Sequence, residues 1–125
     1  MQEFKFDYDM ENDDLFVYNG KKKSKGSVEF GKLVLDFDSN KKLAAIEIMD
    51  ATEFLKPLVR KFKMDKNALA NIISCKVQTS VQNNFLFIRM FILTKISKEQ
   101  LEFPVMIPRI TAKSPSMIKH RISHN

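Results

Sequence analysis

The sequence predicts an α+β domain in which a mostly antiparallel sheet packs on one central helix. Segments of alternating apolar and polar residues, typical of half-buried strands, occur on both sides of a single stretch with helical spacing. The chain has 125 residues, 44% of them hydrophobic and 29% charged, which is the size and balance of one globular domain. We therefore expect a single domain over residues 1–110 and a basic, flexible tail over residues 111–125.

Two hairpins are expected in the N-terminal half. Residues 4–9 and 15–18 form the first, because Phe4, Phe6 and Tyr8 alternate with charged residues and a polar turn follows them. Residues 32–38 and 43–49 form the second, and the polar residues 38–41 between them have the composition of a turn. A short additional strand is expected at residues 27–30.

The central helix is expected to begin after Asp50. Asp50 is a typical N-cap, and Glu53 three residues later completes a capping box. Apolar side chains then recur on one side as far as Phe62, although Pro57 must kink or interrupt the helix. Asp65 is expected to cap one further short helical turn.

Three strands are expected as a meander within residues 65–110. The first runs from Ile73 to Val81 by strict alternation. The second, residues 85–96, is apolar on both faces, so we expect a central strand that is covered on both sides. The third, residues 101–107, contains Pro104, which cannot donate to a ladder and therefore predicts an edge strand.

Several function classes are excluded by composition. Three glycines, none in a G-x-G-x-x-G or G-K-[ST] pattern, exclude a glycine-rich phosphate loop. Cys75 is the only cysteine, which excludes an intrachain disulfide and a cysteine-cluster zinc site and indicates a reducing compartment. The N-terminus lacks the features of a signal peptide, and the longest apolar stretch is too short to span a bilayer. We expect a cytoplasmic protein that does not contact membranes.

The sequence also argues against nucleophilic catalysis. The two histidines, His120 and His124, both fall in the tail, so no Ser-His or Cys-His pair belongs to the folded part. Cys75 lies on the same strand face as Val77 and is expected to pack in the core. We therefore expect a protein that is not an enzyme and binds no cofactor.

Two stretches resemble a known family. The segment Phe6–Val17 resembles the opening Y-D-x-x-x-D-x-L. Residues 33–38 followed by residues 45–52, which contain Ile46-Glu47-Ile48-Met49-Asp50-Ala51-Thr52, resemble a pattern that ends in I-E-I-l-D-A-S. Together they are similar to the domain of unknown function 2283, found in bacteria and archaea. The resemblance covers about residues 4–56, and Ala45 and Thr52 replace a usual glycine and serine.

The resemblance implies a small module of β-hairpins and a helix, and no chemistry. Some family members look like partners in toxin–antitoxin-type gene pairs. An antitoxin-like regulator that binds a small protein toxin is therefore one alternative function.

Acidic residues offer a candidate metal site. Asp7 and Asp9 share one strand face, and Asp36 and Asp38 share another. Clustered carboxylates bind hard cations such as Mg²⁺ and can do acid–base work, so a metal-dependent enzyme is a second alternative if the two hairpins lie side by side. The structural interpretation is favoured, in which these carboxylates face water or form turns.

Glu47 and Asp50 are a possible polar site or interface. Glu47 lies in the middle of an apolar strand, where a carboxylate needs a partner such as Lys32, Arg60 or backbone N–H groups. Glu47 either faces outward from a one-sided sheet or is fixed at a dimer seam or cleft.

Charge is unevenly distributed along the chain. The net charge is +6, yet residues 1–19 carry six acids and one base, which leaves +11 on the remainder. Such a distribution suits an anionic partner. The candidate nucleic-acid contacts are Lys21, Lys22, Lys23, Lys25, Arg60, Lys61 and Lys63. No recognition-helix or RNP-like pattern accompanies them.

The function that the sequence favours is a non-catalytic, self-associating protein-interaction module, expected to be a homodimer. The apolar stretch 85–96 and the edge strand 101–107 motivate it, because an edge strand offers unpaired backbone groups to a second copy. Binding of nucleic acid is the first alternative.

Overall fold

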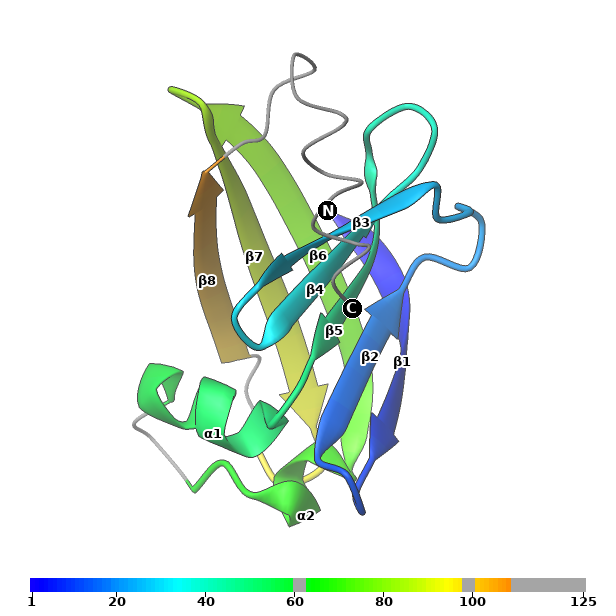
Figure 1. The fold of residues 1–125 in the computed structure, drawn as a ribbon. Helices are drawn as coiled ribbons and strands as arrows, with labels where there is room; N and C mark the ends of the chain where they lie inside the picture. The colour runs from blue at the N-terminus through cyan, green and yellow to red at the C-terminus, as the bar shows by residue number, and fades with distance from the viewer. Residues whose placement is uncertain (60–62, 98–100, 109–125) are drawn as a thin grey trace.

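A single eight-stranded antiparallel sheet forms most of the protein (Figure 1). The computed structural model describes residues 1–59, 63–97 and 101–108. The strands are β1 (Gln2–Asp9), β2 (Asp14–Tyr18), β3 (Gly26–Phe30), β4 (Leu33–Phe37), β5 (Leu43–Ile48), β6 (Ile72–Gln82), β7 (Phe85–Thr94) and β8 (Leu101–Pro108). The helical segments are α1 (Ala51–Leu55), the 3-10 turn η1 (Lys56–Leu58) and α2 (Lys66–Leu69).

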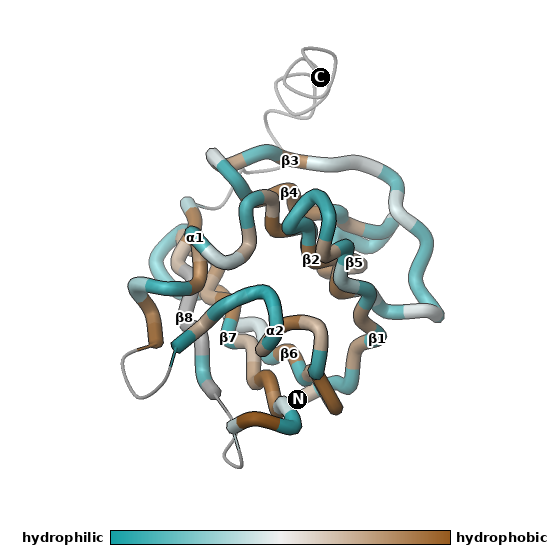
Figure 2. Tube along the Cα trace, turned by 90° about the horizontal axis from the view of Figure 1, so that it is seen from below, coloured by the Kyte–Doolittle hydropathy of each residue, from teal (hydrophilic) through white to brown (hydrophobic). Residues whose placement is uncertain are grey.

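The strands lie in the order β3-β4-β5-β2-β1-β6-β7-β8. Strand β1 joins the two halves of the sheet, because its residues 5–9 pair with β2 and its residues 2–4 pair with β6. The sheet curls into a half-barrel, and α1 and α2 lie at one end of it (Figures 1 and 2). A long β1 shared between two partners is what makes the sheet continuous.

The expected α+β architecture with one central helix is wrong. Helix α1 has five residues, and η1 follows it directly. Pro57 lies within η1, where it lacks the N–H that an α-helix needs and its ring crowds the preceding turn. The apolar side chains of the inner face of the curled sheet pack in one core, to which the short helices add Ala51, Leu55, Ala68 and Leu69. The two hairpins and the C-terminal meander are thus parts of one half-barrel.

Strand β2 does not lie beside β3, although it precedes β3 in sequence. It pairs with β5, in the register Leu15↔Ile48 and Val17↔Ile46. All four of these side chains are buried, so this pairing places two apolar strands at the centre of the core. The chain from β2 to β3 must therefore cross β5 and β4 to reach the far edge of the sheet.

Strand β7 departs from its expected environment. Its inner side chains Ile88, Met90 and Ile92 are fully buried, but its outer face is not covered to the same degree, and Phe85 is 37% exposed. The expectation of a strand covered on both faces is thus wrong for the outer face. Strand β8 lies at one end of the sheet, as an edge strand must.

The expected basic tail, residues 111–125, lies outside the described residues, as does Phe62. Within the described part of the chain, no helix has the length and apolar character that crossing a bilayer requires.

The core makes a first prediction. Ile48 is 0% exposed between β2 and β4. Its replacement by alanine should lower the free energy of unfolding of the protein by about 2–5 kcal/mol, because the lost burial adds to the cost of a cavity. Urea denaturation measures the change. Ile73→Ala is the control, since Ile73 is 51% exposed and its truncation should cost less than about 1 kcal/mol. Equal losses for the two variants would contradict the described core.

Candidate functional site

Asp13 connects the first hairpin to helix α1. Its carboxylate accepts hydrogen bonds from the Tyr8 hydroxyl at 2.6 Å, the Thr52 hydroxyl at 2.6 Å and the Thr52 backbone N–H at 3.2 Å. Its backbone carbonyl accepts from the N–H of Ala51 at 2.8 Å. Asp13 therefore satisfies the free N–H groups at the start of α1 from a different part of the chain.

This arrangement corrects the predicted capping box. Asp50 has a left-handed backbone (φ 50°) and makes no side-chain hydrogen bond to the helix, so it does not cap α1. Its carboxylate instead forms an exposed ion pair with Lys32, 2.7 Å away. Asp65, by contrast, accepts from the N–H of Ala68 at 2.9 Å and caps α2, as predicted.

The Asp13 site is anionic. Partial burial would raise the pKa of Asp13, but hydrogen bonds from Thr52 and Tyr8 outweigh it and hold that pKa below its ordinary value. Burial, followed by the hydrogen bond to Asp13, raises the pKa of the Tyr8 phenol, which therefore remains a donor. The charge of Asp13 is used to hold three segments together.

Glu47 lies on the outer face of the sheet. It pairs with Phe16 on β2 and with Val34 on β4, and Val34 in turn pairs with Glu29 on β3. Directly paired residues of an antiparallel sheet share a face, so these side chains line one row across the outside of the half-barrel. Asp14 belongs to the same outer face, since its neighbour Leu15 points into the core.

The partner of Glu47 is another acid. Of the cationic partners expected for it, Lys32 forms its ion pair with Asp50, and Arg60 lies outside the described residues. A hydrogen bond with Asp14 and partial burial, with further repulsion from Asp14, Asp36 and Glu29, raise the pKa of Glu47 to about 7.

A hydrogen bond between two carboxyl groups requires one shared proton. Oδ1 of Asp14 is buried and finds no donor when both groups are ionised. The protonated Glu47 supplies such a donor. The raised pKa of Glu47 favours its protonated form, which can donate to Asp14 on the outer face.

The four acids of the predicted metal site are spread over the sheet. Asp7 and Asp9 lie on β1 and Asp36 on β4, with β2 and β5 between them, so the strands are about 14 Å apart. Asp38 lies in the β4–β5 turn, where it accepts from the N–H groups of Asn40 and Lys42 at 2.9 Å each. Among the described residues, no three His, Cys, Asp or Glu side chains are placed to hold a metal ion.

The predicted basic contacts fall at two ends of the protein. Lys21, Lys22, Lys23 and Lys25 lie in the β2–β3 crossover, which follows the C-terminal end of β2. Lys63 lies between η1 and α2. These helical segments are at the other end of β2, where Thr52 of α1 donates to Asp13. Arg60 and Lys61 are outside the described residues. Sequence reasoning did not include Lys41 and Lys42, which stand opposite the crossover in the β4–β5 turn.

The structure also shows the surroundings of Cys75 and Arg89. Cys75 is buried, as predicted, and burial raises the pKa of its thiol to about 12. Arg89 is exposed on the outer face of β7, where its Nε donates to Glu102 of β8 at 2.8 Å and its guanidinium lies over the Phe91 ring, 5.6 Å from the centroid.

Comparison with known proteins bears on this site. The family described as protein of unknown function (DUF2283) matches residues 5–51. The N-terminal part of the chain carries this family's module. The match begins on β1 and ends at Ala51, one residue before Thr52, so it contains the hairpin, Asp13 and the whole β3–β5 meander.

Two curated archaeal proteins are also similar. One is a protein of Methanosarcina mazei named "Putative hypoxanthine phosphoribosyltransferase", 33% identical over 88 residues, which are 69% of this chain and 66% of that protein. The other is an uncharacterized protein of Methanocaldococcus jannaschii, 38% identical over 65 residues, 52% of this chain and 54% of that protein. The chain thus spans less than two thirds of either relative. No solved structure matches it.

The motif residues of the DUF2283 module have a physical role here. Tyr8 and Asp13 stand at the Y-D-x-x-x-D positions, and Thr52 stands where the resemblance has serine. A serine hydroxyl would make the same bond to Asp13 that Thr52 makes. These residues join the hairpin to the start of α1.

A second prediction concerns the stability of the protein without the Asp13 charge. Asp13→Asn keeps a residue that tolerates φ 54° but replaces the anionic acceptor, and should lower the unfolding free energy by about 1–3 kcal/mol. Thermal and urea unfolding measure the loss. Thr52→Ser should retain nearly full stability and Thr52→Val should not. Equal stability of these two Thr52 variants would contradict a hydroxyl bond to Asp13.

A third prediction concerns the contribution of Glu47 to the pH dependence of stability. The pKa of Glu47 is raised on folding from 4.5 to about 7, so the stability it contributes is present at acid pH and is lost as pH rises through 7. Glu47→Gln should therefore match the wild type near pH 5 and be the more stable protein near pH 8. Urea midpoints at both pH values test this.

Glu3→Gln is the control for this experiment, because Glu3 is exposed on β1 and pairs with Lys76 rather than with an acid. It should leave the pH dependence as in the wild type. A Glu47→Gln variant with an unchanged pH profile would show that no proton is shared.

Proposed function

We propose that this protein is a non-catalytic interaction module that associates with a second copy of itself through the outer face of strands β7 and β8. The observation that carries the proposal is the apolar character of that face on β7. Phe85, Phe87, Phe91 and Leu93 alternate along one strand and all point away from the core.

The neighbouring strand extends this apolar surface. Met106 on β8 pairs with Phe87 and is 60% exposed, and Pro108 pairs with Phe85. Aromatic and methionine side chains are enriched at the centres of protein–protein interfaces, because they remove a large area from water at a small cost in side-chain entropy. The Arg89–Glu102 pair lies within this row, between Phe87 and Phe91, and adds one hydrogen-bonded polar group to the apolar face.

The edge of β8 is the weaker part of the surface. Pro104 and Pro108 are four residues apart in one strand, so their backbone nitrogens lie on the same side of β8 relative to β7. Proline has no N–H, and it is tolerated where that group would point away from the ladder. The outward donors of β8 are then reduced to those of Glu102 and Met106, which disfavours a continuous ladder between two copies. The face, rather than the edge, is the proposed interface.

The polar groups of the described residues support a binding role more than a catalytic one. The carboxylates of Asp13, Asp38 and Asp65 are occupied by hydrogen bonds that hold turns and helix starts. The Cys75 thiol is buried and remains protonated at neutral pH, which makes it a poor nucleophile.

A fourth prediction tests this proposal. Sedimentation of the 14.6 kDa chain should show a species of twice that mass at micromolar concentrations. The double variant Phe85→Lys/Met106→Lys should sediment as a monomer, because it places charges on both sides of a symmetric apolar interface.

Met10→Lys/Leu58→Lys is the matched control, since it converts two exposed apolar residues elsewhere on the protein. It should remain dimeric. A wild-type protein that is monomeric up to about 100 μM would contradict the proposal, as would a control variant that dissociates as readily as the test variant.

A further inference from the structure

The β2–β3 crossover and the β4–β5 turn lie against each other at one end of the half-barrel. The crossover, residues 19–25, must pass the ends of β5 and β4, a distance of about 14 Å over three strand spacings. The turn that joins β4 to β5, residues 38–42, occupies the same end of the same strands. Strand order therefore brings together two lysine-rich segments that are separate in sequence.

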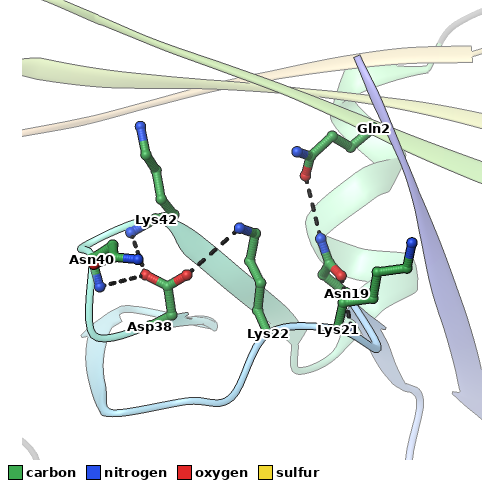
Figure 3. Close-up of polar contacts among 7 residues, drawn as sticks. All are labelled: Gln2, Asn19, Lys21, Lys22, Asp38, Asn40 and Lys42. Atoms are coloured by element: carbon green, nitrogen blue, oxygen red, sulfur yellow. Dashed lines mark hydrogen bonds and ion pairs between the residues drawn. The ribbon is translucent and has the colours of Figure 1, made fainter.

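Hydrogen bonds hold the two segments in place. The N–H of Asn19 donates to Ala44 at 2.8 Å, and the N–H of Lys25 donates to Phe37 at 2.7 Å, so both ends of the crossover are tied to β4 and β5. Between them, the Lys22 ammonium lies 3.6 Å from the Asp38 carboxylate (Figure 3). The crossover is thus held to β4 and β5 at both ends and to the β4–β5 turn through Lys22.

Seven lysines belong to this surface, which we call the lysine platform. They are Lys5, Lys21, Lys22, Lys23, Lys25, Lys41 and Lys42. Lys5 joins from β1, since its Nζ lies 3.2 Å from the position of a Cβ at Gly20. A side chain at residue 20 would press on Lys5, so the glycine leaves room for the ammonium to lie along the crossover.

Few acids offset this charge. Asp38 is the carboxylate of the two loops, and the N–H groups of Lys42 and Asn40 already bind it and lower its pKa. Asp36, on the adjoining strand, accepts the Ser27 hydroxyl at 2.5 Å. Within the described part of the chain, Lys22 is the one platform lysine with an ion pair, so the other six ammonium groups are available to a ligand.

We propose that the lysine platform binds the phosphate backbone of a nucleic acid. Ammonium groups on flexible stems suit repeated phosphates, and they give affinity that does not depend on sequence. Amide side chains stand among the lysines: Asn19 donates to Gln2 at 3.3 Å, and Asn40 lies in the β4–β5 turn (Figure 3). Amides of this kind commonly contact phosphates and sugars.

The surroundings of the platform favour nucleic acid over a lipid surface. Peripheral membrane binding needs apolar side chains that insert beside the basic ones. None of the large exposed apolar residues of the described chain lies in residues 19–25 or 38–42. This site is also separate from the proposed dimer face on β7 and β8, so each copy keeps its platform whether or not the protein self-associates.

The test is fluorescence anisotropy with labelled single strands and duplexes of about 20 nucleotides. The variant Lys21→Gln/Lys23→Gln/Lys25→Gln/Lys42→Gln changes four exposed lysines and spares Lys22 and its ion pair. We expect at least tenfold weaker binding. On a single strand, the slope of log K against log salt should fall by about 2 to 3, because each phosphate contact contributes about 0.7.

The matched control is Lys56→Gln/Lys63→Gln/Lys66→Gln/Lys95→Gln, which removes the same charge from exposed lysines outside the platform. It should bind like the wild type. The proposal is overturned if both quadruple variants lose affinity equally, if the control loses more, or if the wild type binds neither nucleic acid. It is also overturned if polyglutamate or phosphatidylserine vesicles bind the platform as tightly as nucleic acid does. Unchanged urea midpoints in both variants exclude loss of folding as the cause.

Discussion

The pairing of β2 with β5 is the constraint on which the rest of the structure depends. It places Leu15 and Val17 against Ile48 and Ile46, so that four buried side chains meet at the middle of the sheet. The partner of β2, strand β5, follows β3 and β4 in sequence. Strands β4 and β3 therefore lie on the far side of β5, at one edge of the sheet. The N-terminal module is therefore a continuous arrangement of five paired strands rather than two independent hairpins.

Three polar features follow from this single pairing. It brings Asp13 at the start of β2 to Thr52 at the end of β5, where the helix begins. It sets Asp14 and Glu47 on one face, where Asp14 raises the pKa of Glu47. It sends the chain after Tyr18 across the ends of β5 and β4, which assembles the lysine platform. Each feature joins residues far apart in sequence, and each lies at a different part of the same two strands.

Many local features could be predicted from the sequence because they depend on neighbouring residues. Alternation located the strands, Asp38 and Asp65 were recognisable from turn and cap chemistry, and Cys75 was expected in the core. The central helix was predicted wrongly because helical spacing after Asp50 outweighed the effect of Pro57. The cap of α1 was assigned to the nearest acid, although the residue that performs this role, Asp13, lies thirty-nine positions from Thr52.

The sequence by itself determined which residues form strands, which face of each strand is apolar, and which family module the N-terminal part carries. Only the tertiary structure decided the partner of each strand, because alternation specifies a face but not a neighbour. The partner of Glu47, the cap of α1 and the meeting of Lys22 with Asp38 all depend on strand order. That order is selected by the burial of apolar side chains over the whole sheet, a quantity that no local pattern contains.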